Sequence, residues 1–173
     1  MPNHVLQLDR LLQTSLADFV TDATSEQWQG KERDCVNRFA MGYLVDACGR
    51  HHFLKHATQI GIEMSVAQPS RVGVRPTAPK DLVIWRRPWS TCWDNDENAA
   101  LAPLAVIEWK VSRGRKGGRD TTHDATWLQA FTKANPKSVG YSVAVRFRAG
   151  DEHCTIRATR FFRDNHNDRW FSS

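Results

Sequence analysis

The sequence has few cysteines, and they lack the spacing of a metal site. Cys35, Cys48, Cys92 and Cys154 are far apart, and none belongs to a CxxC pair. Structural zinc sites draw on closely spaced cysteine and histidine pairs, so this pattern gives no support to one. We expect the four thiols to be reduced and partly buried.

Long apolar runs and a leader sequence are also missing. No stretch approaches the roughly 18 apolar residues of a membrane span. The N-terminus lacks the basic, apolar and small-residue segments of a secretory signal. These absences predict a soluble, cytoplasmic protein with no membrane partner. The 173 residues are 40% hydrophobic and 25% charged, which is typical of one globular domain, here residues 1–173.

The charge that is present is mainly basic. The chain has 24 Lys and Arg against 19 Asp and Glu, a formal net charge of +5. Such a balance favours a polyanionic partner, although many basic proteins bind nothing acidic. The cluster Arg50, His51, His52 and His56 lacks the glutamate of an HExxH motif, and we interpret it as a solvated helix end.

Apolar periodicity divides the chain into helices and strands. Helices are predicted at 3–20, over about 18 residues ending near Gly49, and at 123–134. Strands are predicted at 59–66, 80–85, 104–111, 138–147 and 153–162, with 67–79 and 86–103 as connections and 163–173 as a polar, peripheral tail. This order indicates an α/β fold with a central sheet flanked by helices.

The segment 104–111, LAVIEWKV, sets a glutamate and a lysine into an apolar run. Alternate side chains of a strand share a face, so Glu108 and Lys110 point one way and Trp109 points the other. Charged groups in so apolar a strand are costly unless they face a cleft, each other or a metal ion. The run therefore predicts a partner carboxylate.

Asp81 is the expected partner, because it lies at the mouth of the preceding strand and consecutive strands usually neighbour one another. Two adjacent carboxylates repel unless a cation lies between them. With oxygen ligands only, that cation would be Mg²⁺, with Mn²⁺ possible as well. A turn cap is the simpler alternative for Asp81.

Two further features leave alternatives open. Glu32 lies at the edge of the apolar stripe of the second helix, where it either joins the site or complements the helix dipole. Trp89 and Trp93 in the connection 86–103 either pin it by packing or offer a stacking surface for bases, and we favour packing.

The arrangement PKD (Pro79, Lys80, Asp81), a long loop and then EWK (Glu108, Trp109, Lys110) resembles the PD-(D/E)XK nuclease superfamily over about residues 30–147. One departure is that Lys80, instead of proline, precedes the aspartate. The resemblance implies a restriction-endonuclease-like αβββαβ core with a mixed sheet, extended here by an N-terminal helix and a C-terminal strand.

The resemblance also implies a Mg²⁺-dependent endonuclease that hydrolyses DNA. Asp81, Glu108 and the main-chain carbonyl of Trp109 would bind the metal ion. Lys110 would orient the attacking water, help to deprotonate it or stabilise charge on the phosphate. Glu32 matches the helix acid of many members, in preference to Glu26, and Gln129 lies where some members place a polar site residue.

The segment 112–119 that follows Lys110 is rich in glycine and arginine. Its cations Arg113, Arg115, Lys116 and Arg119 are expected to contact phosphates. Specificity would come from loops or from a larger protein partner. A homodimer is plausible because cutting both strands of a duplex takes two sites. Two other functions stay open: a nucleic-acid-binding module of the same fold without catalysis, and an interaction protein that docks through Trp89 and Trp93.

Overall fold

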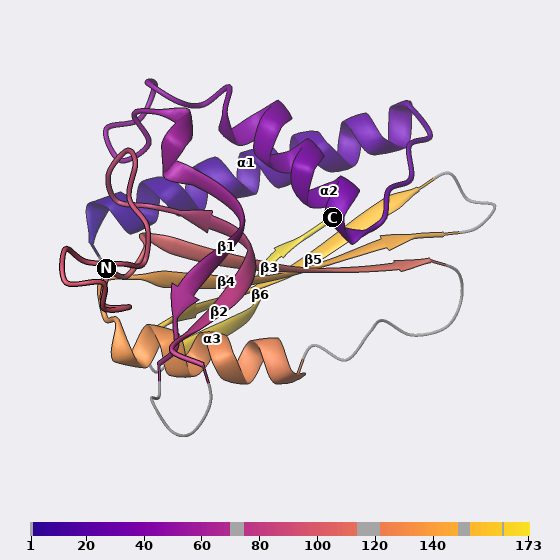
Figure 1. Ribbon diagram of the computed structural model, residues 1–173. Coiled ribbons are helices and arrows are strands. Elements are labelled where there is room, and N and C mark those ends of the chain that lie inside the picture. The colour runs from indigo at the N-terminus through magenta and orange to yellow at the C-terminus, as the bar shows by residue number, and fades with distance from the viewer. Residues whose placement is uncertain (1, 70–74, 114–121, 149–152, 164) are drawn as a thin grey trace.

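A computed structural model describes residues 2–69, 75–113, 122–148, 153–163 and 165–173 (Figure 1). Six strands form one mixed sheet in the order β1-β2-β3-β4-β5-β6, in which only β3 and β4 are parallel. The helices are α1 (Asn3–Ser25), α2 (Glu32–Phe39), the π-helical turn η1 (Ala40–Leu44), the 3-10 turn η2 (Ala57–Gln59) and α3 (Thr122–Ala134). The strands are β1 (Ile60–Ala67), β2 (Thr77–Ile84), β3 (Ala105–Arg113), β4 (Val139–Phe147), β5 (Cys154–Phe162) and β6 (Asn165–Ser172).

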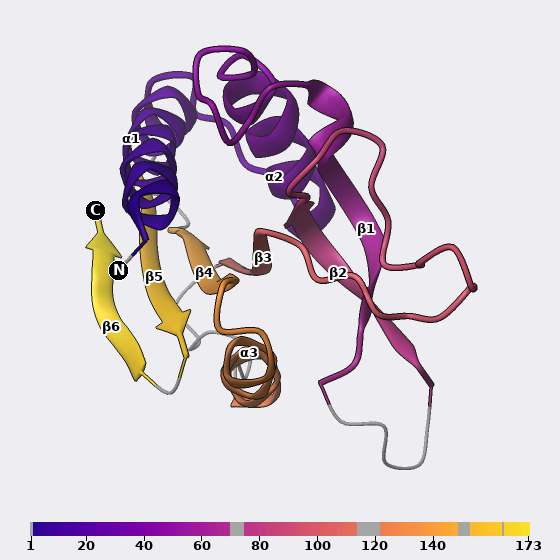
Figure 2. The same cartoon turned by 90° about the vertical axis from the view of Figure 1, so that its left-hand side faces the viewer.

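The helices form two layers, one on each face of the sheet (Figure 2). The α1 and α2 helices cover one face and α3 covers the other, where it also provides the crossover that the parallel β3–β4 pair requires. The predicted α/β architecture with a flanked mixed sheet is therefore confirmed. Within the described residues, no helix is both long and apolar enough to cross a membrane.

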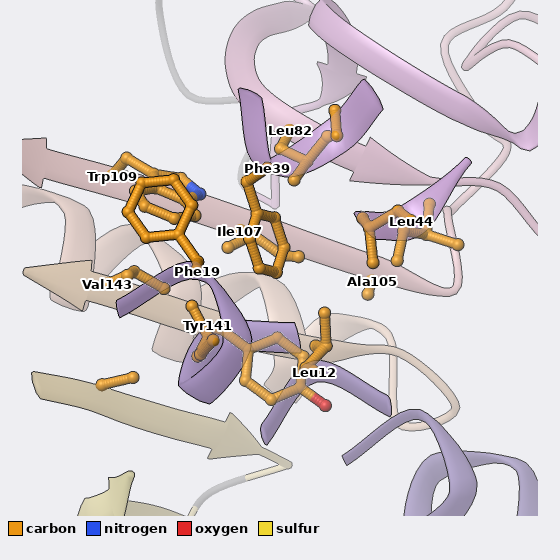
Figure 3. Close-up of a cluster of buried hydrophobic side chains, with 14 of the residues drawn as sticks. Leu12, Phe19, Phe39, Leu44, Leu82, Ala105, Ile107, Trp109, Tyr141 and Val143 are labelled. Carbon is orange, nitrogen blue, oxygen red and sulfur yellow. The ribbon is translucent and has the colours of Figure 1, made fainter. Parts of the chain in front are cut away.

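The larger core lies between the sheet and the α1/α2 layer (Figure 3). Ile107 and Trp109 of β3 point into it, and the indole of Trp109 packs against Phe19 and Phe39 with ring centroids 5.9 and 5.2 Å apart. Val106 points to the other face and joins the α3 core. Side chains of β3 therefore alternate between two buried faces. The odd-numbered residues face α1 and α2, and the even-numbered residues face α3.

A buried polar contact fixes α1 on the sheet. Asp9 lies in the apolar stripe of α1, where its carboxylate accepts a hydrogen bond from the Tyr141 hydroxyl at 2.8 Å and pairs with Arg160 at 2.7 Å. Burial is the main cause that raises the pKa of Tyr141, and Asp9 raises it further. Tyr141 therefore stays protonated and acts as the donor to Asp9.

Three sequence-based boundaries were wrong. The second helix is shorter than expected because the α-helix gives way to η1 at Ala40. β2 begins at Thr77, so Pro79 lies within a strand; β2 pairs with β3 only over Leu82–Ile84, and strand edges tolerate proline. The tail 163–173 is not peripheral, because β6 extends the sheet beside β5 and buries Trp170.

The packing interpretation of the connection 86–103 also needs correction. Trp89 is 78% exposed, and Trp93 is exposed as well. The buried side chains are instead Cys92 within this segment and Trp85 directly before it. Trp85 is thus buried whereas Trp89 and Trp93 are exposed, and the sequence pattern does not separate an anchoring indole from a solvated one.

Replacing Trp170 tests whether the C-terminal strand stabilises the fold. Trp170 packs on Tyr141 with ring centroids 4.8 Å apart, and its carbonyl accepts a hydrogen bond from Gln13 of α1 at 2.9 Å. Trp170→Ala should lower the free energy of unfolding by about 3 kcal/mol, measured by urea denaturation. The exposed Asp168→Ala in the same strand should change it by less than about 0.5 kcal/mol. Equal stability of both variants would contradict this role for β6.

Candidate catalytic site where β2 and β3 separate

The candidate site forms where the β2–β3 ladder ends. The two strands pair from Ile84 and Ala105 as far as Leu82 and Ile107. Beyond that point the main-chain N–H of Trp109 donates a hydrogen bond of 2.7 Å to the Asp81 carboxylate. A side chain thus replaces the next main-chain partner, which satisfies a buried donor and holds Asp81 in the gap between the strands.

A kink opposite Asp81 reorients the side chains of β1 and β2. The register pairs Ile62 with Leu82 and Met64 with Lys80, and Glu63 between them has a φ of 53°, in the left-handed region. Ile62 and Leu82 face the α1/α2 core, whereas Met64 packs on the α3 core.

The side chain of Lys80, like that of Met64, points to the α3 side of the sheet. Its ammonium lies 3.7 Å from the centroid of the Trp127 ring, on the α3 side of the sheet. Residues two positions apart normally share a face of a strand, so Lys80 and Leu82 depart from regular alternation. Asp81 lies at the change of face and, with Glu32 and Glu63, borders a small cavity of about 60 Å³.

Glu108 is held in a buried ion pair. Its Oε1 lies 2.5 Å from the Lys80 Nζ, and both side chains are less than a tenth exposed. Burial raises the pKa of Glu108 to about 7, Lys80 opposes the shift, and the nearby carboxylates of Asp81 and Asp124 add to it. Asp81, whose carboxylate is held by the Trp109 N–H, therefore contributes to the raised pKa of Glu108.

Lys110 joins both helical layers to the site. Its Nζ lies 3.0 Å from Asp124 Oδ2 on α3 and 3.8 Å from Glu32 Oε1 at the start of α2, and it donates to the Trp109 carbonyl at 3.0 Å. Burial alone would lower the pKa of Lys110, but Asp124 and then Glu32 and Asp81 outweigh it and raise the pKa. Lys110 is therefore a protonated cation at neutral pH.

The structure brings together most of the residues that the sequence singled out. Glu32, Asp81, Glu108, Lys110 and the Trp109 main chain belong to one cluster. Glu26, the other helix acid considered, instead pairs with Arg38 at the surface, at 2.6 Å.

Gln129 is not brought into this cluster. It is exposed on α3, and it lies five residues after Asp124, which is roughly 140° around the helix. Arg113 is exposed at the end of β3. The other predicted phosphate contacts, Arg115, Lys116 and Arg119, lie outside the described residues.

Two members of the cluster were missed by the sequence reading. Lys80 was noted only as a departure from the family pattern, although a lysine beside an aspartate in an apolar strand also calls for a buried partner. The one sequence feature that could have drawn attention to Asp124 is its position in the first turn of the third helix. Spacing cannot show that this turn lies against Lys110.

The acidic donors of the cluster are carboxylate oxygens, the ligand type that Mg²⁺ prefers. Four carboxylates, of Glu32, Asp81, Glu108 and Asp124, face two ammonium groups, of Lys80 and Lys110, which leaves a formal charge of −2 when all are ionised. No three acidic, histidine or cysteine side chains converge on one ion position in the part of the chain that is described. Mg²⁺ usually keeps several water ligands and binds through one or two carboxylates.

The raised pKa of Glu108 predicts how stability depends on pH. Between pH 4.5 and about 7 the folded state holds a proton on Glu108 that the unfolded state has released. The free energy of unfolding should therefore fall as pH rises through this window. Between pH 5 and pH 8, the free energy of unfolding of wild type should fall by up to about 3 kcal/mol more than that of Glu108→Gln. Urea denaturation at each pH measures this difference. Exposed Glu63→Gln is the matched control and should behave like wild type; identical pH dependence of wild type and Glu108→Gln would contradict the shift.

Comparisons with known proteins add no relative to this picture. No family model, no curated protein and no solved structure matches the chain. Function is therefore inferred from the side chains of the cluster and their chemistry.

Proposed function

We propose that this protein is a metal-dependent phosphodiesterase that hydrolyses nucleic acid, with DNA as the expected substrate. The observation that carries the proposal is that Asp81 accepts a hydrogen bond from the N–H of Trp109, the residue between Glu108 and Lys110, where β2 and β3 separate. The order of elements from α2 to β4, helix, three strands, helix and strand, supports it, because it agrees with the αβββαβ core that the sequence resemblance implies.

The carboxylates of Asp81 and Glu108 and the carbonyl of Trp109 would hold the divalent cation. When bound, Mg²⁺ or Mn²⁺ supplies a hydroxide at neutral pH and neutralises charge on the phosphate. Asp81 is already oriented by the N–H of Trp109, and the Trp109 side chain is anchored in the core. The ligands thus lie on packed strands, as a preorganised site requires.

Lys110 serves as an electrostatic clamp. Asp124 and Glu32 keep it protonated, so it is a poor general base and a good donor to a phosphate oxygen. Asp124 is the nearer acid, at 3.0 Å against 3.8 Å for Glu32. Both acids are positioning residues for the ammonium group in this proposal.

The basic charge of the chain suits the substrate. The formal net charge is +5, and exposed Arg113 follows Lys110 by three residues along β3. Cations beside a phosphodiester site supply sequence-independent contacts to the backbone of nucleic acid. Binding should therefore weaken as salt concentration rises.

Cleavage assays on plasmid DNA with Mg²⁺ or Mn²⁺ test the proposal. Asp81→Asn removes a metal-binding charge and Lys110→Met removes the clamp, and each should slow nicking by at least about 100-fold. Glu26→Gln, which alters an acid paired with Arg38 outside the cluster, is the control and should keep wild-type activity.

Two results would count against the proposal. Nicking that persists in both Asp81→Asn and Lys110→Met would point to a contaminating nuclease. Salt-sensitive DNA binding by wild type, without metal-dependent cleavage, would favour the nucleic-acid-binding module instead.

A further inference from the structure

Lys80 is the more buried of the two lysines in the cluster, and it has no role in the proposed reaction. Its side chain is 8% exposed, against 21% for Lys110. The ammonium lies between Glu108 Oε1, at 2.5 Å, and the face of the Trp127 ring, at 3.7 Å from the centroid. An acid and an aromatic face thus replace the water that this lysine loses.

The position of Lys80 follows from the kink in β1 and β2. Regular alternation would put residue 80 beside Leu82, under the α1/α2 layer. The change of face at Glu63 and Asp81 turns Lys80 toward α3 instead, where Glu108 lies. The fold therefore delivers this ammonium group to the carboxylate that the proposed reaction needs as a ligand.

The two lysines of the cluster differ in which acids they contact. Lys110 pairs with Asp124 and Glu32, neither of which is an expected metal ligand, and its contact with an expected ligand is a hydrogen bond to the uncharged Trp109 carbonyl. Lys80 pairs with Glu108, which is one. A divalent cation on Glu108 would meet a positive charge already bound to the same carboxylate, and like charges this close in a buried site repel strongly.

We propose that Lys80 is a resident cation that competes with the divalent metal ion for Glu108 and so weakens metal binding. The inference rests on the proposed function, because it takes Glu108 as a metal ligand. In the metal-free protein Lys80 neutralises Glu108. In the loaded protein the ammonium gives up part of this contact, and the repulsion that remains keeps metal affinity low.

Calorimetric titration of the full chain with Mn²⁺ at pH 8.5 tests the competition without relying on activity. Lys80→Met removes the charge but keeps an unbranched apolar side chain against Trp127, and it should tighten Mn²⁺ binding by at least about tenfold. Lys80→Arg keeps the charge and should stay within about threefold of wild type.

Arg33→Met is the matched control for losing a positive charge near the site. Arg33 is exposed and pairs at 3.0 Å with Glu63, which borders the same cavity as Asp81 but does not contact Glu108 in the described structure. Its loss should tighten Mn²⁺ binding by less than about threefold, because exposed charges are screened. Lys80→Gln provides a second uncharged variant if Lys80→Met does not melt cooperatively.

The outcomes separate this inference from the proposed function. Wild-type Mn²⁺ binding that Asp81→Asn abolishes, together with equal or weaker binding by Lys80→Met and Lys80→Gln, overturns the competition and leaves the proposed metal site standing. A lack of Asp81-dependent binding in wild type and in both Lys80 variants overturns the proposed metal site and the competition with it. Tighter, Asp81-dependent binding in the uncharged variants supports both.

Discussion

The hydrogen bond from the Trp109 N–H to the Asp81 carboxylate is the contact on which the candidate site depends. It lies where the β2–β3 ladder stops, and it satisfies a donor that the missing strand partner leaves open. The same residue anchors the strand through its indole, which packs on Phe19 and Phe39. Because both the main chain and the side chain of Trp109 make packed contacts, the backbone positions of its neighbours Glu108 and Lys110 are fixed as well.

The charged side chains of the cluster form ion pairs, but the four acids outnumber the two lysines, so the cluster is negative overall when all are ionised. Lys80 neutralises Glu108, and Lys110 is shared by Asp124 and Glu32. Asp81 accepts a hydrogen bond from a main-chain donor and interacts electrostatically with Lys110. This arrangement explains why burial and neighbouring acids raise the pKa of Glu108 even though a lysine contacts it directly.

The sequence could predict the features that depend on the short repeat of side-chain direction along a helix or strand. Alternation in 104–111 separates Trp109 from Glu108 and Lys110, and the structure has them so. The kink at Glu63 could not be predicted, because glutamate rarely adopts a positive φ and gives no turn signal. The apolar strand around Lys80 indicated a buried partner, but the kink decides that this partner is Glu108. Asp124 was missed because its contact with Lys110 joins distant elements. β6 was missed because only Trp170 and Phe171 in it are apolar.

Lys110 touches helices from both faces of the sheet, and this gives the molecule an internal electrostatic link. Asp124 belongs to α3 and Glu32 to α2, and a sheet normally separates such layers completely. At the gap between β2 and β3 one flexible side chain spans them. The ammonium group of this one lysine therefore gives α2 and α3 a shared electrostatic partner, so the position of each helix bears on the position of the other's acid.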